Sequence, residues 1–172
     1  MKTFMKTRKF EKREPKHQQG FSMIEVLVAL VIIAVALLGT AGLQVHAMKI
    51  SKSGEFRTQA VFLASDIAER MEANKAAAIL GNYVVATTSA PSASATPCGE
   101  VACNAAALAS DDISQWETNI ANLLPQASWS ITQTTAGNPS TYRILIRWTD
   151  RSTDNASGGE IFSYTADRTI GN

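Results

Sequence analysis

Few side chains in this sequence have the type and spacing that catalysis requires. The two histidines, His17 and His46, lie in a basic leader and in an apolar run. Asp111 and Asp112 are adjacent carboxylates, but the start of a helix accounts for both, because acidic residues are favourable near a helix N-terminus. The motifs typical of nucleophilic, zinc-dependent or phosphate-binding enzymes are absent. The sequence therefore predicts a protein that is not an enzyme and needs no metal or cofactor.

One carboxylate has an unusual setting. Glu25 is the single charge between Gln19 and Gln44, and no Asp, Glu, Lys or Arg occurs from Val26 to Met48. A helical run of about 18 or more apolar residues is long enough to cross a bilayer of ~30 Å. An ionisable group in such a segment is costly and indicates a functional site with a partner. The alternative is a carboxylate that reaches back to the membrane interface.

The two cysteines are the other candidates for chemistry. Cys98 and Cys103 lie in the part of the chain that we expect to face an oxidising compartment, where an even count favours a disulfide. The loop that they close is short, so the bond should fix a local turn and contribute less than the ~3 kcal/mol of a roughly 15-residue loop. A metal site is not indicated, because no further ligands cluster nearby.

Charge is distributed unevenly along the 172 residues. Residues 1–20 carry seven Lys or Arg and two Glu, whereas the remainder carries nine Lys or Arg and thirteen Asp or Glu. A basic segment directly before an apolar run stays on the cytoplasmic side of a membrane. We therefore expect the amino end inside and the carboxyl end outside. This topology signal explains the leader better than nucleic-acid binding, because the outer domain is mildly acidic.

The apolar run predicts one long helix with two different halves. Residues 21–48 are apolar on all sides, as lipid requires. After Lys49, apolar residues at spacings of three and four predict an amphipathic continuation to about Leu80, with a stop at Gly81-Asn82. This stripe consists of Phe56, Ala60, Leu63, Ile67 and Met71.

A secretory signal peptide is the competing interpretation of the apolar run. Such a peptide has a basic start, an apolar core of about 7–15 residues and a small-x-small cleavage site. Ala34-Val35-Ala36 has the pattern of such a site, but the run continues past it to Leu43 and contains Glu25 near its start. A retained membrane helix fits better.

The rest of the chain predicts a short helix followed by strands. Residues 84–110 are rich in Ala, Ser, Thr and Pro and predict a connection without a packed element. Ser110 is the expected N-cap of a helix with an apolar face of Ile113, Trp116, Ile120 and Leu123. Alternating patterns then predict three strands in an antiparallel meander that packs on the amphipathic helix. Their inward residues are Ala127, Trp129 and Ile131; Tyr142, Ile144, Ile146 and Trp148; and Phe162, Tyr164 and Ala166.

The start of the apolar helix carries a specific motif. Gly20-Phe21-Ser22-Met23-Ile24-Glu25 after a basic leader resembles the class III signal of type IV pilins and type II secretion pseudopilins. The resemblance implies that a prepilin peptidase cuts between Gly20 and Phe21 and methylates the new amino group of Phe21. It also implies that Glu25 draws the N-terminal charge of a neighbouring subunit into register, an attraction that is stronger in low dielectric than in water.

Longer segments resemble minor pilins of the PilV type, also called pilus modification proteins. The similarity rests on Ile24–Leu30, Leu37–Gln44, a Cys pair ahead of a Trp-bearing helix that ends in Leu123-Leu124-Pro125, and Tyr142–Trp148. It implies the α+β pilin fold, in which a long N-terminal helix packs on a small antiparallel sheet. The leader is longer than in type IVa prepilins. The Cys pair precedes the strands, whereas in major pilins it usually brackets the C-terminal region, which argues against a major pilin.

The resemblance also implies an organisation and a function. Residues 1–20 would be a cleaved cytoplasmic leader, 21–48 the transmembrane and filament-core half of the helix, and 49–172 a periplasmic head domain. The protein would be a minor pilin that supports assembly and initiation of the type IV pilus. Its expected partners are the prepilin peptidase, other minor and major pilins, the pilus assembly platform and inner-membrane lipid, with no nucleic acid. Two alternatives remain: a minor pseudopilin of a type II secretion system, and a membrane-anchored periplasmic binding domain that does not polymerise.

Overall fold

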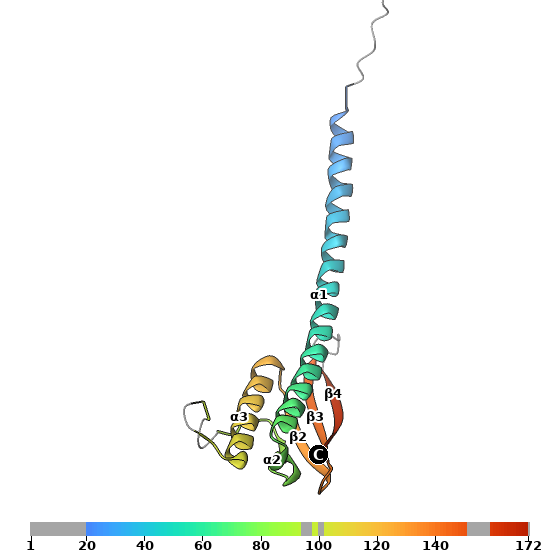
Figure 1. Ribbon diagram of the computed structural model, residues 1–172. Helices are drawn as coiled ribbons and strands as arrows, with labels where there is room; N and C mark the ends of the chain where they lie inside the picture. Colours follow the sequence, from blue (N-terminus) through green and yellow to red (C-terminus); the bar gives the residue numbers. More distant parts are fainter. Residues whose placement is uncertain (1–19, 94–97, 100–101, 151–158, 172) are drawn as a thin grey trace, which may run out of the picture. The chain divides into compact units, whose positions relative to one another are not determined.

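The computed structural model describes residues 20–93, 98–99, 102–150 and 159–171, so the predicted leader lies almost entirely outside the described residues. Figure 1 shows the elements. In chain order they are α1 (Met23–Ala73), α2 (Lys75–Ile79), β1 (Val85–Thr88), α3 (Ala105–Leu123), β2 (Ser128–Thr135), β3 (Ser140–Asp150) and β4 (Glu160–Ile170). The chain divides into two compact units, residues 1–44 and 45–172.

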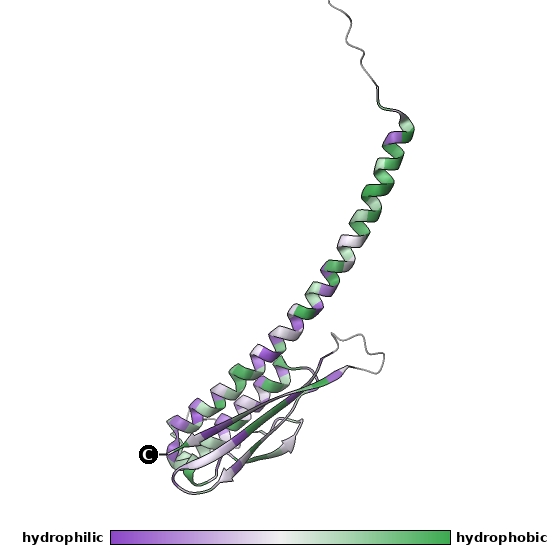
Figure 2. Cartoon of the chain, turned by 90° about the vertical axis from the view of Figure 1, so that its right-hand side faces the viewer, coloured by the Kyte–Doolittle hydropathy of each residue, from purple (hydrophilic) through white to green (hydrophobic). Residues whose placement is uncertain are grey.

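The described part of the first unit is the start of α1 and the residues before it. Every residue from Gly20 to Gln44 is exposed. α1 contains a window long and apolar enough to cross a membrane, with a mean hydropathy of 2.8, and none of that window is buried by the chain. In Figure 2 the hydrophobic colour dominates this part of the helix. An apolar surface of this extent needs lipid or other apolar helices to cover it.

In the second unit, the later part of α1 packs into the core. The predicted stripe is confirmed, with Phe56 half-buried and the other four residues buried. Ala64 and Ala68 are also buried and complete this face of the helix. Small side chains allow close approach of the neighbouring elements, but alanine is a weak marker of a buried face in sequence alone, because it is common on both faces of helices.

α1 ends earlier than the predicted end near Leu80. Asn74, with φ −115° and ψ 52°, leaves the helical conformation, and the short α2 follows it. The Asn74 side chain donates from Nδ2 to the carbonyl of Ala105 at 2.8 Å and to Oη of Tyr83 at 3.2 Å. The partners that hold Asn74 come from distant segments, so no local pattern could have revealed the break.

The predicted helix stop at Gly81-Asn82 is confirmed, but it terminates the short α2 and not the long α1. Gly81 has a φ of 84°, a conformation that favours glycine. The N–H of Asn82 donates to the carbonyl of Ala77, and the N–H of Gly81 donates to that of Ala78. These two bonds form a Schellman C-cap.

One four-stranded antiparallel sheet contains the three predicted strands, in the order β1-β2-β3-β4. β3 pairs with β4 along its whole length, from Ser140 opposite Ile170 to Asp150 opposite Glu160. The predicted meander is therefore confirmed. All predicted inward residues are buried or half-buried, and the half-buried ones are Phe162 and Tyr164.

Two elements lie where a connection without packed structure was predicted. Val85–Thr88 forms β1, an edge strand paired with β2. α3 begins at Ala105, and its N-cap is Asn104, whose Oδ1 accepts from the N–H of Ala107 at 2.9 Å. The prediction of a Ser110 cap is therefore wrong, because Ser110 lies inside the helix. The alanines after Asn104 favour helix strongly enough to extend it toward the N-terminus.

The apolar face of α3 also differs from the prediction at one end. Ile113, Trp116 and Ile120 are buried as predicted, but Leu123 is 45% exposed and Leu124 is buried in its place. Leu124 is the C-cap residue with extended backbone angles, so the helical periodicity no longer applies to it. Trp116 donates from Nε1 to the carbonyl of Leu63 at 2.8 Å, which joins α3 directly to α1.

Ala64 tests the close packing of α1 in the second unit. Its side chain is 1% exposed, so Ala64→Leu should overpack the core and lower the free energy of unfolding by about 1–3 kcal/mol. The measurement is urea unfolding of the full chain in detergent, followed by the fluorescence of the buried tryptophans. Val61→Leu is the matched control, because Val61 is 37% exposed, and it should change stability by less than ~0.5 kcal/mol. Equal effects of the two substitutions would contradict close packing at Ala64.

Candidate processing and assembly site

The predicted processing residues lie at the start of α1. Gly20, Phe21 and Ser22 precede the helix and are exposed. The carbonyl of Ser22 accepts from the N–H of Glu25 at 3.0 Å and from that of Val26 at 3.3 Å, so helical hydrogen bonding begins at Ser22. The peptide bond between Gly20 and Phe21 therefore lies outside the helix, where an enzyme can reach it without unwinding α1.

Glu25 lies in the first turn of α1 and is exposed. A carboxylate there interacts favourably with the positive end of the helix dipole. Ser22 and Glu25 also have the spacing of a capping box, a local signal that the motif-based prediction did not use. No residue in the part of the chain that the structure describes forms an ion pair with Glu25. The structure thus places Glu25 near Gly20 and Phe21 and leaves its charge without a counter-ion there.

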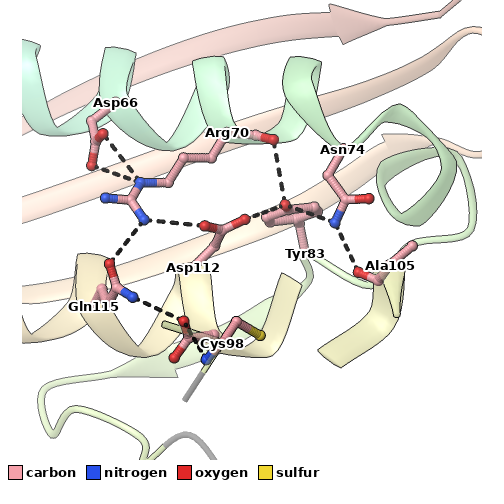
Figure 3. Close-up of polar contacts among 9 residues, drawn as sticks. Asp66, Arg70, Asn74, Tyr83, Cys98, Ala105, Asp112 and Gln115 are labelled. Atoms are coloured by element: carbon pink, nitrogen blue, oxygen red, sulfur yellow. Dashed lines mark hydrogen bonds and ion pairs between the residues drawn. The ribbon is translucent and has the colours of Figure 1, made fainter. Parts of the chain in front are cut away.

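A second polar group, the Arg70 network, joins α1 to α3 (Figure 3). Arg70 donates from Nε to Asp66 at 3.1 Å, and from Nη1 to Asp112 at 3.1 Å and to Gln115 at 3.3 Å. Arg70 therefore binds Asp66, four residues earlier on α1, and at the same time binds residues of α3. This network holds the two helices in register.

Tyr83 extends the Arg70 network toward the break after α1. Its hydroxyl donates to Oδ2 of Asp112 at 2.6 Å and accepts from Nδ2 of Asn74 at 3.2 Å. Burial raises the pKa of Tyr83, because the phenolate would lose its hydration, and the hydrogen bond to the Asp112 carboxylate raises that pKa further. The Tyr83 proton is therefore held firmly in the folded protein.

The adjacent carboxylates Asp111 and Asp112 do not mark a helix start, which corrects the prediction. Both lie inside α3, and each binds a different segment. Asp112 binds Arg70 and Tyr83, as described above, whereas Oδ2 of Asp111 accepts from the N–H of Cys98 at 3.2 Å. Their role is to fix tertiary contacts, which spacing in the sequence could not show.

The predicted disulfide between Cys98 and Cys103 is present, with 5.7 Å between the two Cα atoms. Asp111 anchors its first cysteine through the hydrogen bond from the Cys98 N–H. The disulfide therefore joins the connection after β1 to the segment that leads into α3, and Asp111 ties it to that helix.

Glu117 is a buried carboxylate that the sequence analysis did not single out. It is 1% exposed and accepts from Nε1 of Trp129 at 2.9 Å and from the N–H of Ser92 at 2.6 Å. These bonds join α3 to β2 and to the connection after β1. A buried carboxylate needs such donors, so Glu117 has a structural role here. Among the described residues, no group of three or more His, Cys, Asp or Glu is placed to hold a metal ion.

Comparisons with known families agree with this architecture. The family described as "Type IV pilin Tt1218" matches residues 42–114, and the "Prokaryotic N-terminal methylation motif" matches residues 15–41. No curated protein and no solved structure gives a significant match. The long apolar helix and the antiparallel sheet define a pilin-like α+β protein. More narrowly, the chain is similar to type IV pilins over residues 42–114 and to the N-terminal methylation motif over residues 15–41.

The match to the methylation motif covers Gly20, Phe21 and Glu25, the residues of the predicted processing and assembly site. By length and composition, α1 can cross a membrane.

Tyr83 makes the stability of the second unit depend on pH. Because folding raises its pKa above the ordinary value of about 10, its contribution is complete below pH ~10 and is lost as the pH rises further. Tyr83→Phe should therefore reduce the decline in the free energy of unfolding above pH ~10. Urea unfolding at a series of pH values measures this. Asp112→Asn should reduce this decline in stability less than Tyr83→Phe does, because it removes the carboxylate beside Tyr83 but leaves Tyr83 buried. Parallel curves for the wild type and Tyr83→Phe would contradict the assignment.

Proposed function

We propose that this protein is a type IV pilin and, within that family, a minor pilin of the PilV type. In this proposal the protein is held in the inner membrane with its C-terminal head in the periplasm, and is then built into the pilus to support its initiation. The observation that carries the proposal is the motif from Gly20 to Glu25, directly ahead of an apolar helix that no described part of the chain covers. Such a surface needs lipid first and apolar helices of other pilins after assembly.

The first step is removal of residues 1–20. The basic leader keeps this segment on the cytoplasmic side, so the prepilin peptidase would act there. Cleavage between Gly20 and Phe21 creates a new amino group, which the same enzyme would methylate on Phe21. The exposure of this peptide bond and its position ahead of α1 support this step.

Glu25 would act in the second step, the docking of a subunit onto the growing filament. An uncompensated carboxylate among apolar helices is strongly unfavourable, and so is an uncompensated N-terminal cation. Pairing the two charges removes both penalties and favours one register between neighbouring helices. The charge of Glu25 has no counter-ion among the described residues, which supports a partner outside the chain.

The position of the disulfide supports a minor pilin over a major one. Cys98 and Cys103 lie before α3 and the strands β2 to β4. In major pilins the bond usually brackets the C-terminal region instead. A deletion strain separates the proposal from its alternatives. Loss of piliation and twitching with normal enzyme secretion is the expected result, whereas the reverse would indicate a type II pseudopilin. Absence of the processed protein from sheared pili would indicate a domain that does not polymerise.

Gly20→Ala tests the cleavage site. A Cβ at Gly20 would meet no atom within 4 Å, so the substitution leaves the fold unchanged and its effect reports on the peptidase alone. We expect the variant to keep its leader, as seen by intact mass, while the wild type begins at N-methyl-Phe21. Gly54→Ala is a matched control, since a Cβ there is equally unobstructed, and it should be processed normally. A mature Gly20→Ala protein of normal mass would refute the site.

Glu25→Ala tests the docking charge. The variant should still be cleaved, but its amount in sheared pili should fall about tenfold or more, because a lost charge pair in low dielectric exceeds ~1.4 kcal/mol. Glu25→Asp should restore part of the incorporation. Glu72→Ala is the control, since Glu72 lies in the second unit and pairs with Lys75 of the same chain. Unchanged incorporation of processed Glu25→Ala would remove the proposed role.

A further inference from the structure

A hollow of about 490 Å³ lies in the second unit, and no role described above uses it. We call it the base pocket. One wall is α1, which contributes Lys49, Lys52 and Phe56. Their spacings of three and four residues place them on one face of the helix. Nζ of Lys52 lies 5.1 Å from the centre of the Phe56 ring and 2.8 Å from the carboxylate of Glu55. This wall therefore combines two ammonium groups with an aromatic surface.

The other described residues that line the base pocket come from two further segments. They are Pro125 and Gln126, which connect α3 to β2, and Thr149 and Asp150 at the end of β3. The N–H of Thr149 donates to the carbonyl of Pro125 at 3.0 Å, so the connection is tied to the sheet. Gln126 has a φ of 49°, a conformation that persists only where the surrounding structure holds it.

The base pocket lies beside the end of the apolar run. Met48 is the last residue of that run, and Lys49 and Lys52 follow it by one and four residues, or about 1.5 and 6 Å along the helix axis. Val45 lies one turn before Lys49 on the same face and is exposed, as is Met48. When the apolar run spans a bilayer, the two lysines are therefore at the depth of the lipid headgroups.

We propose that the base pocket binds the phosphate headgroup of a membrane glycerophospholipid. The ammonium groups of Lys49 and Lys52 contact the phosphate, and the glycerol and first acyl carbons pack on Phe56. The acyl chains continue along the face that carries Val45. The proposal rests on the membrane residence in the proposed function, but not on incorporation into a pilus.

The mixed lining of the base pocket favours this ligand over a free anion. Lys49, Lys52 and Asp150 line it together with the ring of Phe56, and Glu55 pairs with Lys52. A phospholipid can use both parts of this lining, because its phosphate meets the ammonium groups and its acyl carbons meet the ring. Apolar contact must supply part of the affinity, and only a lipid offers it.

Protection of lysines from acetylation tests the proposal. The full chain in dodecyl maltoside is treated with acetic anhydride, with and without the water-soluble lipid dihexanoylphosphatidylglycerol below its critical micelle concentration. Mass spectrometry then gives the reactivity of each lysine. We expect the lipid to lower the reactivity of Lys49 and Lys52 several-fold and to leave Lys75 unchanged, since Lys75 lies in α2, away from the pocket.

Two further ligands decide what the base pocket recognises. Dihexanoylglycerol lacks the phosphate, and inorganic phosphate lacks the acyl chains, so neither should protect the lysines at the same concentration. Equal protection by dihexanoylglycerol would show an apolar site only, and equal protection by inorganic phosphate would show a free anion site. Either result, or no protection by the phospholipid, would overturn the proposal.

A matched pair of variants provides a second measurement. Lys52 pairs with Glu55 and Lys75 pairs with Glu72, in both cases at a spacing of three residues, so Lys52→Gln and Lys75→Gln remove comparable ion pairs. After extraction from nanodiscs of phosphatidylethanolamine and phosphatidylglycerol, native mass spectrometry counts the retained phospholipid. Lys52→Gln should lower it several-fold and Lys75→Gln should not, whereas equal retention would refute the site. Neither assay involves pili, so failure here is distinct from failure of the proposed function.

Discussion

The uncovered apolar surface of α1 is the constraint on which the rest of the protein depends. From Met23 to Met48 this helix offers side chains that no described segment of the chain packs against. A surface of that kind is stable only in lipid or against equivalent helices. The motif at Gly20-Phe21 and the charge of Glu25 lie at its start, and in the proposed function they govern the passage of the helix from lipid into the filament.

The later part of the same helix differs, because other elements of its own chain cover its apolar face. Ala60, Ala64 and Ala68 allow the neighbouring elements to approach closely, and Trp116 of α3 reaches the Leu63 carbonyl. The Arg70 network then fixes α3 against α1. Packing supplies the stabilisation, while these polar bonds select one arrangement of the two helices.

The sequence predicts this fold well where the signal is local and repeated. The buried stripe of α1 and the three alternating strands follow from periodicity, whereas the residues of the processing site stay a prediction from a motif. Two of the misses share one physical cause. The break at Asn74 and the use of Asp112 by Arg70 and Tyr83 depend on partners distant in the chain. The early start of α3 is different, since Asn104 and the alanines after it were a local signal that the Ser110 assignment overlooked.

The carboxylates of this protein show how its two units differ. Glu117 is buried and Asp112 is half-buried in the second unit, and each receives donors from other segments of the same chain. Glu25 is equally unsuited to an apolar environment, yet no described residue forms an ion pair with it. The second unit folds against itself and can satisfy its charges internally. In the proposed function, an internal counter-ion at Glu25 would remove the penalty that makes docking to a neighbour's amino terminus selective.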